Sequence, residues 1–213
     1  MDAAMEGRGD RQRRPAPVQD LEAYRGAMRA RGDFTAYLGM LVFLASWAML
    51  FGSLFFAYAL VRARAPVWPP AGDPRLPLLL PAVNTVVMTL SSLAVQSALR
   101  SLRRGRPRPV AGTLALAAGL GALFLALQLA VWVRVYGQGL VPSGGPYGSV
   151  FYALTSFHAL HVLVGLVALA WLSVRASRGA YGALRHVRVR LWAMYWHFVG
   201  VIWLVLYATV YVL

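Results

Sequence analysis

The chain has 213 residues, of which 59% are hydrophobic and only 13% are charged, a composition that soluble domains of this size rarely show. Its 21 basic residues outnumber 7 acidic ones, all of the basic residues are arginine, and cysteine is absent, which excludes disulfides, thiolate metal sites and a cysteine nucleophile. The arginines lie between long apolar runs, so we interpret them as signals of membrane topology and expect no nucleic-acid partner.

Residues 1–33 form a polar tail that holds seven arginines and six acidic residues. The tail lacks the short apolar core and the small-residue cleavage site of a secretory signal. We predict a flexible or surface-lying cytoplasmic segment, followed by one membrane domain over residues 34–213.

Five apolar runs in that domain are long enough to cross a bilayer, which requires about 20 helical residues. They cover residues 36–61, 76–99, 110–133, 149–174 and 191–213. The predicted fold is therefore all-α, an integral membrane bundle of five transmembrane helices. Pro81 predicts either a kink in the second helix or its first turn.

The arginines predict the orientation of these helices. The tail and the second and fourth connectors hold 17 arginines, whereas the first and third connectors hold four. Because positive loops face the cytoplasm, the N-terminus is predicted to be cytoplasmic and the C-terminus to lie outside.

The predicted spans contain no carboxylate and no lysine. Proton pumps and cation transporters usually bind their ion with a buried ionisable group, so this pattern argues against an autonomous transporter of that kind. The sequence also lacks a P-loop, a dinucleotide-binding fingerprint and a hydrolase nucleophile elbow. Any chemistry inside the membrane would rest on histidines.

Three histidines lie in the predicted spans. His158 and His161 share one face of the fourth helix, and His197 lies on the fifth. One interpretation is axial ligation of a heme, as in a quinone-linked membrane anchor. The second interpretation makes these histidines structural residues at helix–helix contacts or near lipid headgroups. We favour the second, because His161 and His197 would differ in depth by about 10 Å at 1.5 Å per residue.

Two amides, Asn84 and Gln128, are the other costly polar groups in the spans, and we expect both to join helices by hydrogen bonds. The third span carries a seam of small residues, an ordinary packing device, at Ala115, Gly119, Ala122 and Ala126.

Four segments resemble the subunit III family of heme-copper terminal oxidases. The segment YGSVFYALTSFHALHVLVG (147–165) resembles the family's TGFHGLH-type histidine pair, and YWHFVGVIWLVLYATVYV (195–212) resembles its WHFVD-type last helix. Weaker likeness is found in FLASWAMLFGSLFFAYALVR (43–62) and WPPAGDPRLPLLLPAVNT (68–85). The segments follow the family's order over about 36–213 and suit its short five-helix bacterial form.

This resemblance implies a non-redox accessory subunit of a proton-translocating cytochrome c oxidase in a bacterial cytoplasmic membrane. The chain would have no catalytic centre, because heme and copper belong to the partner subunits. It would stabilise the catalytic subunit I, pack beside subunits I and II, and bind phospholipid. The resemblance leaves membership of a larger respiratory supercomplex open.

The resemblance also suggests two groups of site residues. Packing or lipid-adjacent roles are expected for Trp68, Asn84, Gln128, His158, His161, Trp196 and His197. Contacts with lipid headgroups, which the charge pattern independently allows, are expected for Arg62, Arg103, Arg104, Arg188 and Arg190.

Three membrane carboxylates of the family pattern are missing from this sequence. Trp47, Val131 and Gly200 occupy the positions where family members usually carry an acidic residue. The resemblance implies proton handling near the partner subunit for the family's glutamate, and this sequence has no carboxylate at that position to carry the role. The losses are compatible with a divergent branch or with an accessory subunit of a related nitric oxide reductase.

Overall fold

A computed structural model describes residues 18–70, 73–106, 108–179 and 187–212. The chain divides into two units, Met1–Leu38 and Gly39–Leu213. The first part of the polar tail lies outside the described residues, as does His186, the one histidine that is not in a predicted span.

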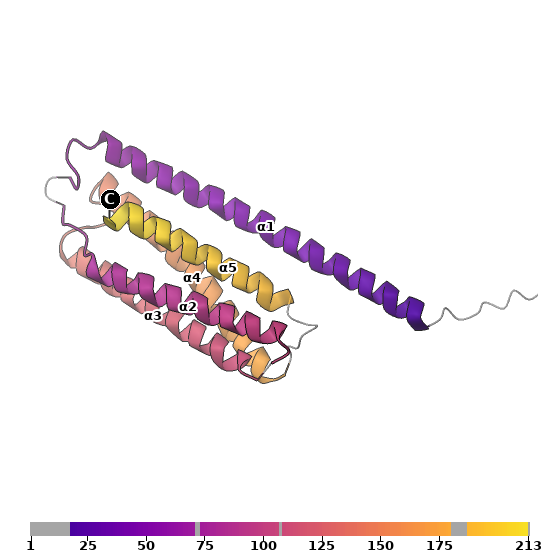
Figure 1. Ribbon diagram of the computed structural model, residues 1–213. Coiled ribbons are helices and arrows are strands. Elements are labelled where there is room, and N and C mark those ends of the chain that lie inside the picture. The colour runs from indigo at the N-terminus through magenta and orange to yellow at the C-terminus, as the bar shows by residue number, and fades with distance from the viewer. Residues whose placement is uncertain (1–17, 71–72, 107, 180–186, 213) are drawn as a thin grey trace, which may run out of the picture. The chain divides into compact units, whose positions relative to one another are not determined.

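The described residues form helices and no strands, which confirms the all-α fold (Figure 1). The elements are α1 (Val18–Arg64), α2 (Leu79–Arg103), α3 (Val110–Gly137), α4 (Pro146–Ser177), α5 (Val187–Leu206) and a terminal π-helix, η1 (Tyr207–Val212). Five helices in this part of the chain are long and apolar enough to cross a membrane, as predicted, the fifth including η1.

The helix boundaries differ from the hydropathy boundaries for local reasons. Pro81 is the third residue of α2, where the missing N–H falls among donors that have no partner within the helix. It therefore belongs to the first turn and is not a kink. Pro146 opens α4 after Gly145, whose φ of 138° suits glycine. Helix α1 starts at Val18, so the second half of the polar tail is helical.

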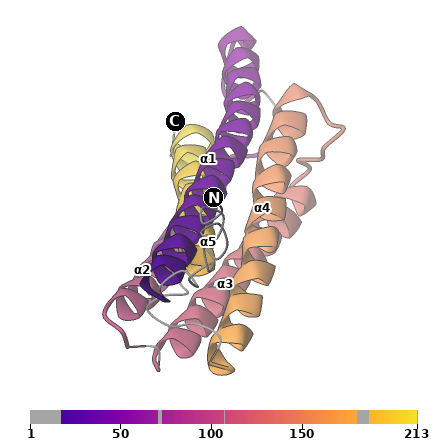
Figure 2. The same cartoon turned by 90° about the vertical axis from the view of Figure 1, so that its right-hand side faces the viewer.

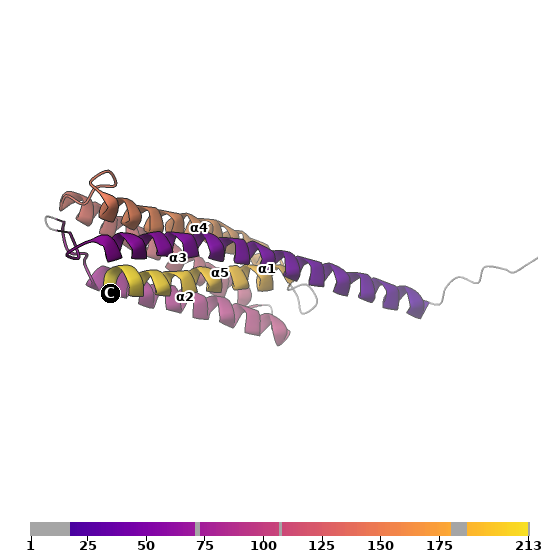
Figure 3. The same cartoon turned by 90° about the horizontal axis from the view of Figure 1, so that it is seen from above.

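Helices α2 to α5 form a closely packed bundle. Backbone contacts join α2 to α3 and α5, and α4 to α3 and α5 (Figure 2). The α1–α2 connector, the α3–α4 connector and the C-terminus gather at one end of this unit (Figure 3). The largest fully buried side chains are Trp196, Trp203, Tyr195, Phe51, Phe124 and Phe151.

The small-residue seam of the third span does not pack against another helix of this unit. All four of its members, Ala115, Gly119, Ala122 and Ala126, are exposed on α3. The small residues that α3 buries are instead Ala117, Ala118 and Gly121. Periodicity identified a stripe of small residues but could not assign its direction, because α3 is apolar on all sides.

Candidate functional site

Helix α4 carries the two motif histidines into the interior of the unit. His158 and His161 are 1% and 3% exposed. His161 Nδ1 donates to the carbonyl oxygen of Phe157, because a carbonyl oxygen can only accept a hydrogen bond. The Tyr195 hydroxyl donates to the backbone oxygen of His161 at 3.0 Å, so the same position also ties α4 to α5.

Aromatic rings enclose His158. Phe51, Phe124 and Trp203 lie 6.4, 5.7 and 5.4 Å from it between ring centroids. These side chains come from α1, α3 and α5 and pack around the imidazole. No group of three or more His, Cys, Asp or Glu side chains is placed to hold a metal ion within the described residues.

His197 lies apart from the other two histidines. It is half-buried and lines an open cavity of about 200 Å³ between α2 and α5. Neither His158 nor His161 lines this cavity. The structure therefore brings the two α4 histidines together and gives His197 a different environment.

Trp196 connects four helices of the unit. Its indole nitrogen donates to the Ser91 hydroxyl on α2 at 3.1 Å, and its ring passes between α3 and α4. A Cβ added at Gly121 or at Gly165 would come within 2.8 or 2.6 Å of that ring. Both positions need glycine because the indole occupies the space of a side chain.

The two predicted amides, Asn84 of α2 and Gln128 of α3, are both buried in the structure. Asn84 and Gln128 are 0% and 1% exposed, and neither amide meets hydrogen-bond geometry among the described residues. The Tyr211 hydroxyl of η1 faces the Gln128 side chain. The interior thus buries polar side chains from α2, α3 and the end of the chain.

Trp68 lies in the connector between α1 and α2 and belongs to an aromatic cluster. Tyr58 and Tyr147 lie 5.6 and 4.8 Å from it between ring centroids, both edge-on. The Arg62 guanidinium lies 5.7 Å from the Trp68 ring centroid, a cation–π contact. Arg62 therefore contacts an aromatic side chain of its own chain.

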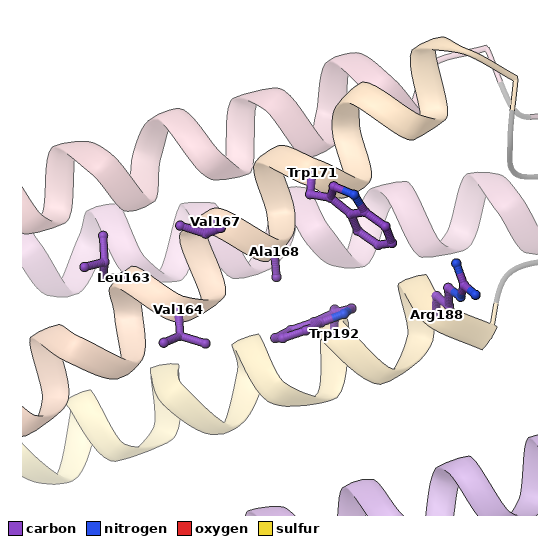
Figure 4. A pocket seen from close by; sticks show the side chains of 7 residues that line it. All are labelled: Leu163, Val164, Val167, Ala168, Trp171, Arg188 and Trp192. Atoms are coloured by element: carbon purple, nitrogen blue, oxygen red, sulfur yellow. The ribbon is translucent and has the colours of Figure 1, made fainter.

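An open groove of about 730 Å³ lies between α4 and α5 (Figure 4). Apolar side chains of α4 line one wall, and Trp192 and Arg188 of α5 line the other. Trp171 of α4 points toward the gap, and the Arg175 guanidinium lies 5.1 Å from its ring centroid. Of the predicted headgroup arginines, Arg188 alone lines this groove, whereas Arg103, Arg104 and Arg190 are exposed elsewhere.

Comparison with known proteins decides the family. The family model described as cytochrome c oxidase subunit III matches residues 21–213. The chain belongs to this family. Proteins named cytochrome c oxidase subunit 3 are 35% identical to it in Thermostichus vulcanus (83% of this chain, 86% of the relative), Synechocystis sp. (82% and 74%) and Ornithorhynchus anatinus (81% and 67%). These matches confirm the resemblance and identify an accessory subunit III of a heme-copper oxidase.

In this subunit III chain the three missing carboxylates fall in three different environments. The Trp47 ring lies edge-on against His161, with centroids 4.0 Å apart. Val131 is fully buried in the apolar interior, and Gly200 lines the cavity beside His197. An acidic side chain restored at each of these three positions would therefore have different neighbours.

Sequence reasoning missed several residues that organise this subunit III fold. Trp203 donates to Thr85 at 3.0 Å and contacts both Phe124 and His158. Trp132 donates to the hydroxyl of Thr155 at 3.0 Å. The presence of tryptophans and hydroxyl residues within the apolar runs could have indicated these pairs, because each buried polar group in a membrane needs a hydrogen-bond partner.

Proposed function

We propose that this chain stabilises the catalytic subunit I of a bacterial cytochrome c oxidase and binds anionic phospholipid in the α4/α5 groove. Its family membership over residues 21–213 supports the association with oxidase subunits, including I and II. The N-terminus would face the cytoplasm and the C-terminus the outside, as the 17 arginines on one side and four on the other indicate.

The groove supports lipid binding through its chemistry. Its walls are the apolar side chains Leu163, Val164 and Val167 of α4, which suit acyl chains. Trp171 and Trp192 are amphipathic rings of the kind that lie at headgroup depth. Arg188 stands at the same end of the groove and supplies a positive charge for a phosphate.

The same placement follows from the chain direction. Under the proposed orientation α4 runs from outside to inside and α5 returns, so Trp171, Arg188 and Trp192 all lie in the cytoplasmic half. The anionic lipids of the inner leaflet face that side. The acyl chains would then extend past Val167 and Val164 toward the bilayer centre.

Lipid analysis of the purified oxidase complex tests this proposal. Arg188→Gln should at least halve the anionic phospholipid retained per complex, and Trp192→Ala should have a similar effect. Arg108→Gln, which removes the same charge from an exposed connector, should retain the wild-type amount. Equal retention in Arg188→Gln and Arg108→Gln would contradict binding in this groove. Retention of zwitterionic lipid only would contradict the charge selectivity.

A deletion of this chain tests the stabilising role. The remaining oxidase should start at a normal rate of oxygen reduction and lose activity several-fold faster during turnover. Added chain should restore the lifetime. An oxidase whose lifetime does not depend on this chain would contradict the role.

A further inference from the structure

One membrane-embedded face of this unit is polar. On α2, Thr85, Thr89, Ser92 and Gln96 follow one another at spacings of four, three and four residues, which places them on the same side of the helix. Across the gap, α5 contributes His197 and Gly200. We call these six residues the α2/α5 polar face. All six are half-buried or exposed, so none is enclosed by this chain.

The polar face lies within the apolar part of α2. Thr85 to Gln96 span roughly 16 Å of helix at 1.5 Å per residue, starting six residues after the beginning of α2. Hydrocarbon would therefore surround these side chains if lipid covered them. Polar groups without partners are costly there, and in membrane proteins they usually face protein or a water-filled cavity.

Three side chains of this face have unused hydrogen-bonding capacity. Thr85 donates to Pro81 and Thr89 donates to Thr85, both within their own helix. In contrast, Ser92, Gln96 and His197 make no hydrogen bond within the described part of the chain. A hydroxyl, an amide and an imidazole are thus half-buried on this face and have no hydrogen-bond partner in the described part of the chain.

The face also contains a notch. Thr85, Thr89, Ser92, His197 and Gly200 line the open cavity of about 200 Å³, which is wide enough for one branched or aromatic side chain. An alanine Cβ at Gly200 would already lie 3.3 Å from the Ser92 hydroxyl, so a larger side chain there would fill the notch. Small residues beside hydroxyls are the pattern that allows a second helix to approach closely.

The exposed side of α3 provides the contrast. Between Ala115 and Ala130 its exposed residues are only alanine, glycine and leucine. Lipid acyl chains can cover such a surface without leaving any polar side chain unsatisfied. Compared with this side of α3, the α2/α5 polar face carries a hydroxyl, an amide and an imidazole.

From this asymmetry we infer that the α2/α5 polar face is the surface on which a transmembrane helix of another oxidase subunit docks. That helix inserts one large side chain into the notch beside Gly200 and presents hydrogen-bonding groups to Ser92, Gln96 and His197. The inference rests on the proposed association with the oxidase and adds the location and chemistry of the contact.

Photo-crosslinking in native membranes tests the location. A benzophenone amino acid replaces Thr89 on the polar face or Leu116 on the exposed side of α3. The Thr89 probe should form an adduct with another oxidase subunit, identified by mass spectrometry, and the Leu116 probe should label lipid. Adducts of the Thr89 probe with lipid alone, or with a second copy of this chain, would overturn the inference.

Matched substitutions test the notch and the polar side chains beside it. Gly200→Leu fills the notch, whereas Gly119→Leu adds the same side chain on α3, where no atom lies within 4 Å of the added Cβ. Co-purification of oxidase subunits should fall at least tenfold for Gly200→Leu and remain unchanged for Gly119→Leu. Gln96→Leu, which suits lipid better than glutamine does, should also lower co-purification. The reverse order of the glycine variants would assign the contact to α3 and overturn the inference.

Two controls separate the causes of failure. Each variant chain must elute as a single species in detergent and unfold cooperatively, and Gln96→Leu serves as the second readout if Gly200→Leu does not fold. A wild-type chain that never co-purifies with heme-copper subunits would overturn the proposed function and this inference together. A wild-type chain that co-purifies, with all polar-face variants unaffected, would overturn this inference alone.

Discussion

The indole nitrogen of Trp196 donates a hydrogen bond of 3.1 Å to the hydroxyl of Ser91, although the two positions are 105 residues apart in the sequence. Ser91 in turn donates to the backbone oxygen of Ala117 at 2.8 Å. One buried hydroxyl thus joins α2, α3 and α5. In a membrane, where apolar burial against lipid contributes little to helix association, such bonds and close packing hold helices together.

Ser91→Ala should therefore destabilise the bundle by about 1–3 kcal/mol, because it removes both hydrogen bonds and leaves the buried indole N–H without an acceptor. The measurement is unfolding of the chain by SDS in mild detergent. Ser97→Ala is the matched control, since the Ser97 hydroxyl donates only to Ala94 of its own helix. Equal losses of stability in the two variants would contradict the bridging role.

Gly165→Ala should destabilise the unit by about 1–3 kcal/mol, because the new methyl group would lie 2.6 Å from the Trp196 ring. Gly119→Ala should be neutral or stabilising by up to about 1 kcal/mol, because that position is open and alanine favours helix. The same SDS titration measures both. In a Trp196→Phe background the cost of Gly165→Ala should shrink, and an unchanged cost would show that the indole is not the obstacle.

Hydropathy and the arginine pattern were sufficient to predict five helices, because length and apolarity determine which segments can span a bilayer. The motif residues His158, His161 and Trp196 were candidates for packing roles and are buried in the structure, but the sequence did not indicate which side chains surround them. Helix rotation determines which residues face the bundle. It places Gly121 and Gly165 against the Trp196 ring and leaves the small-residue seam of α3 exposed. In helices that are apolar all round, periodicity does not determine rotation.

The start of α2 and the pairing of α2 with α5 were also beyond what a single sequence can predict. Pro81 was compatible with a kink or a first turn, and the start of α2 at Leu79 decides for the turn. The α2/α5 polar face combines residues more than 100 positions apart, such as Thr85 and Gly200. Single-sequence reasoning cannot pair such positions, because the contact between α2 and α5 is itself a product of folding.

Trp47→Ala should loosen α1 from the bundle. Residues of α1 from Gly39 onward meet α4 and α5 through aromatic side chains, and the Trp47 ring is the one that lies nearest, 4.0 Å from His161 between ring centroids. Hydrogen exchange of residues 39–64 in detergent should increase, whereas exchange in α2 to α5 should stay as in the wild type. Met49→Ala is the control, because Met49 is 78% exposed. A comparable increase in the Met49→Ala variant would contradict a specific role for Trp47.

Restoring the family's acidic residues one at a time should give unequal results, because the three positions differ in burial. Val131→Glu should cost several kcal/mol, since Val131 is 0% exposed among apolar neighbours and a buried carboxylate without partners is strongly unfavourable. Gly200→Asp should be tolerated far better, because Gly200 opens on a cavity beside His197 and the Ser92 hydroxyl. The comparison uses the purified full chain in detergent, with the yield of monodisperse protein and the SDS midpoint as readouts. Val131→Leu serves as the control for added volume. If Val131→Glu were as stable as Gly200→Asp, the interior around α3 would have to accommodate charge, and the apolar packing described for Val131 would be wrong.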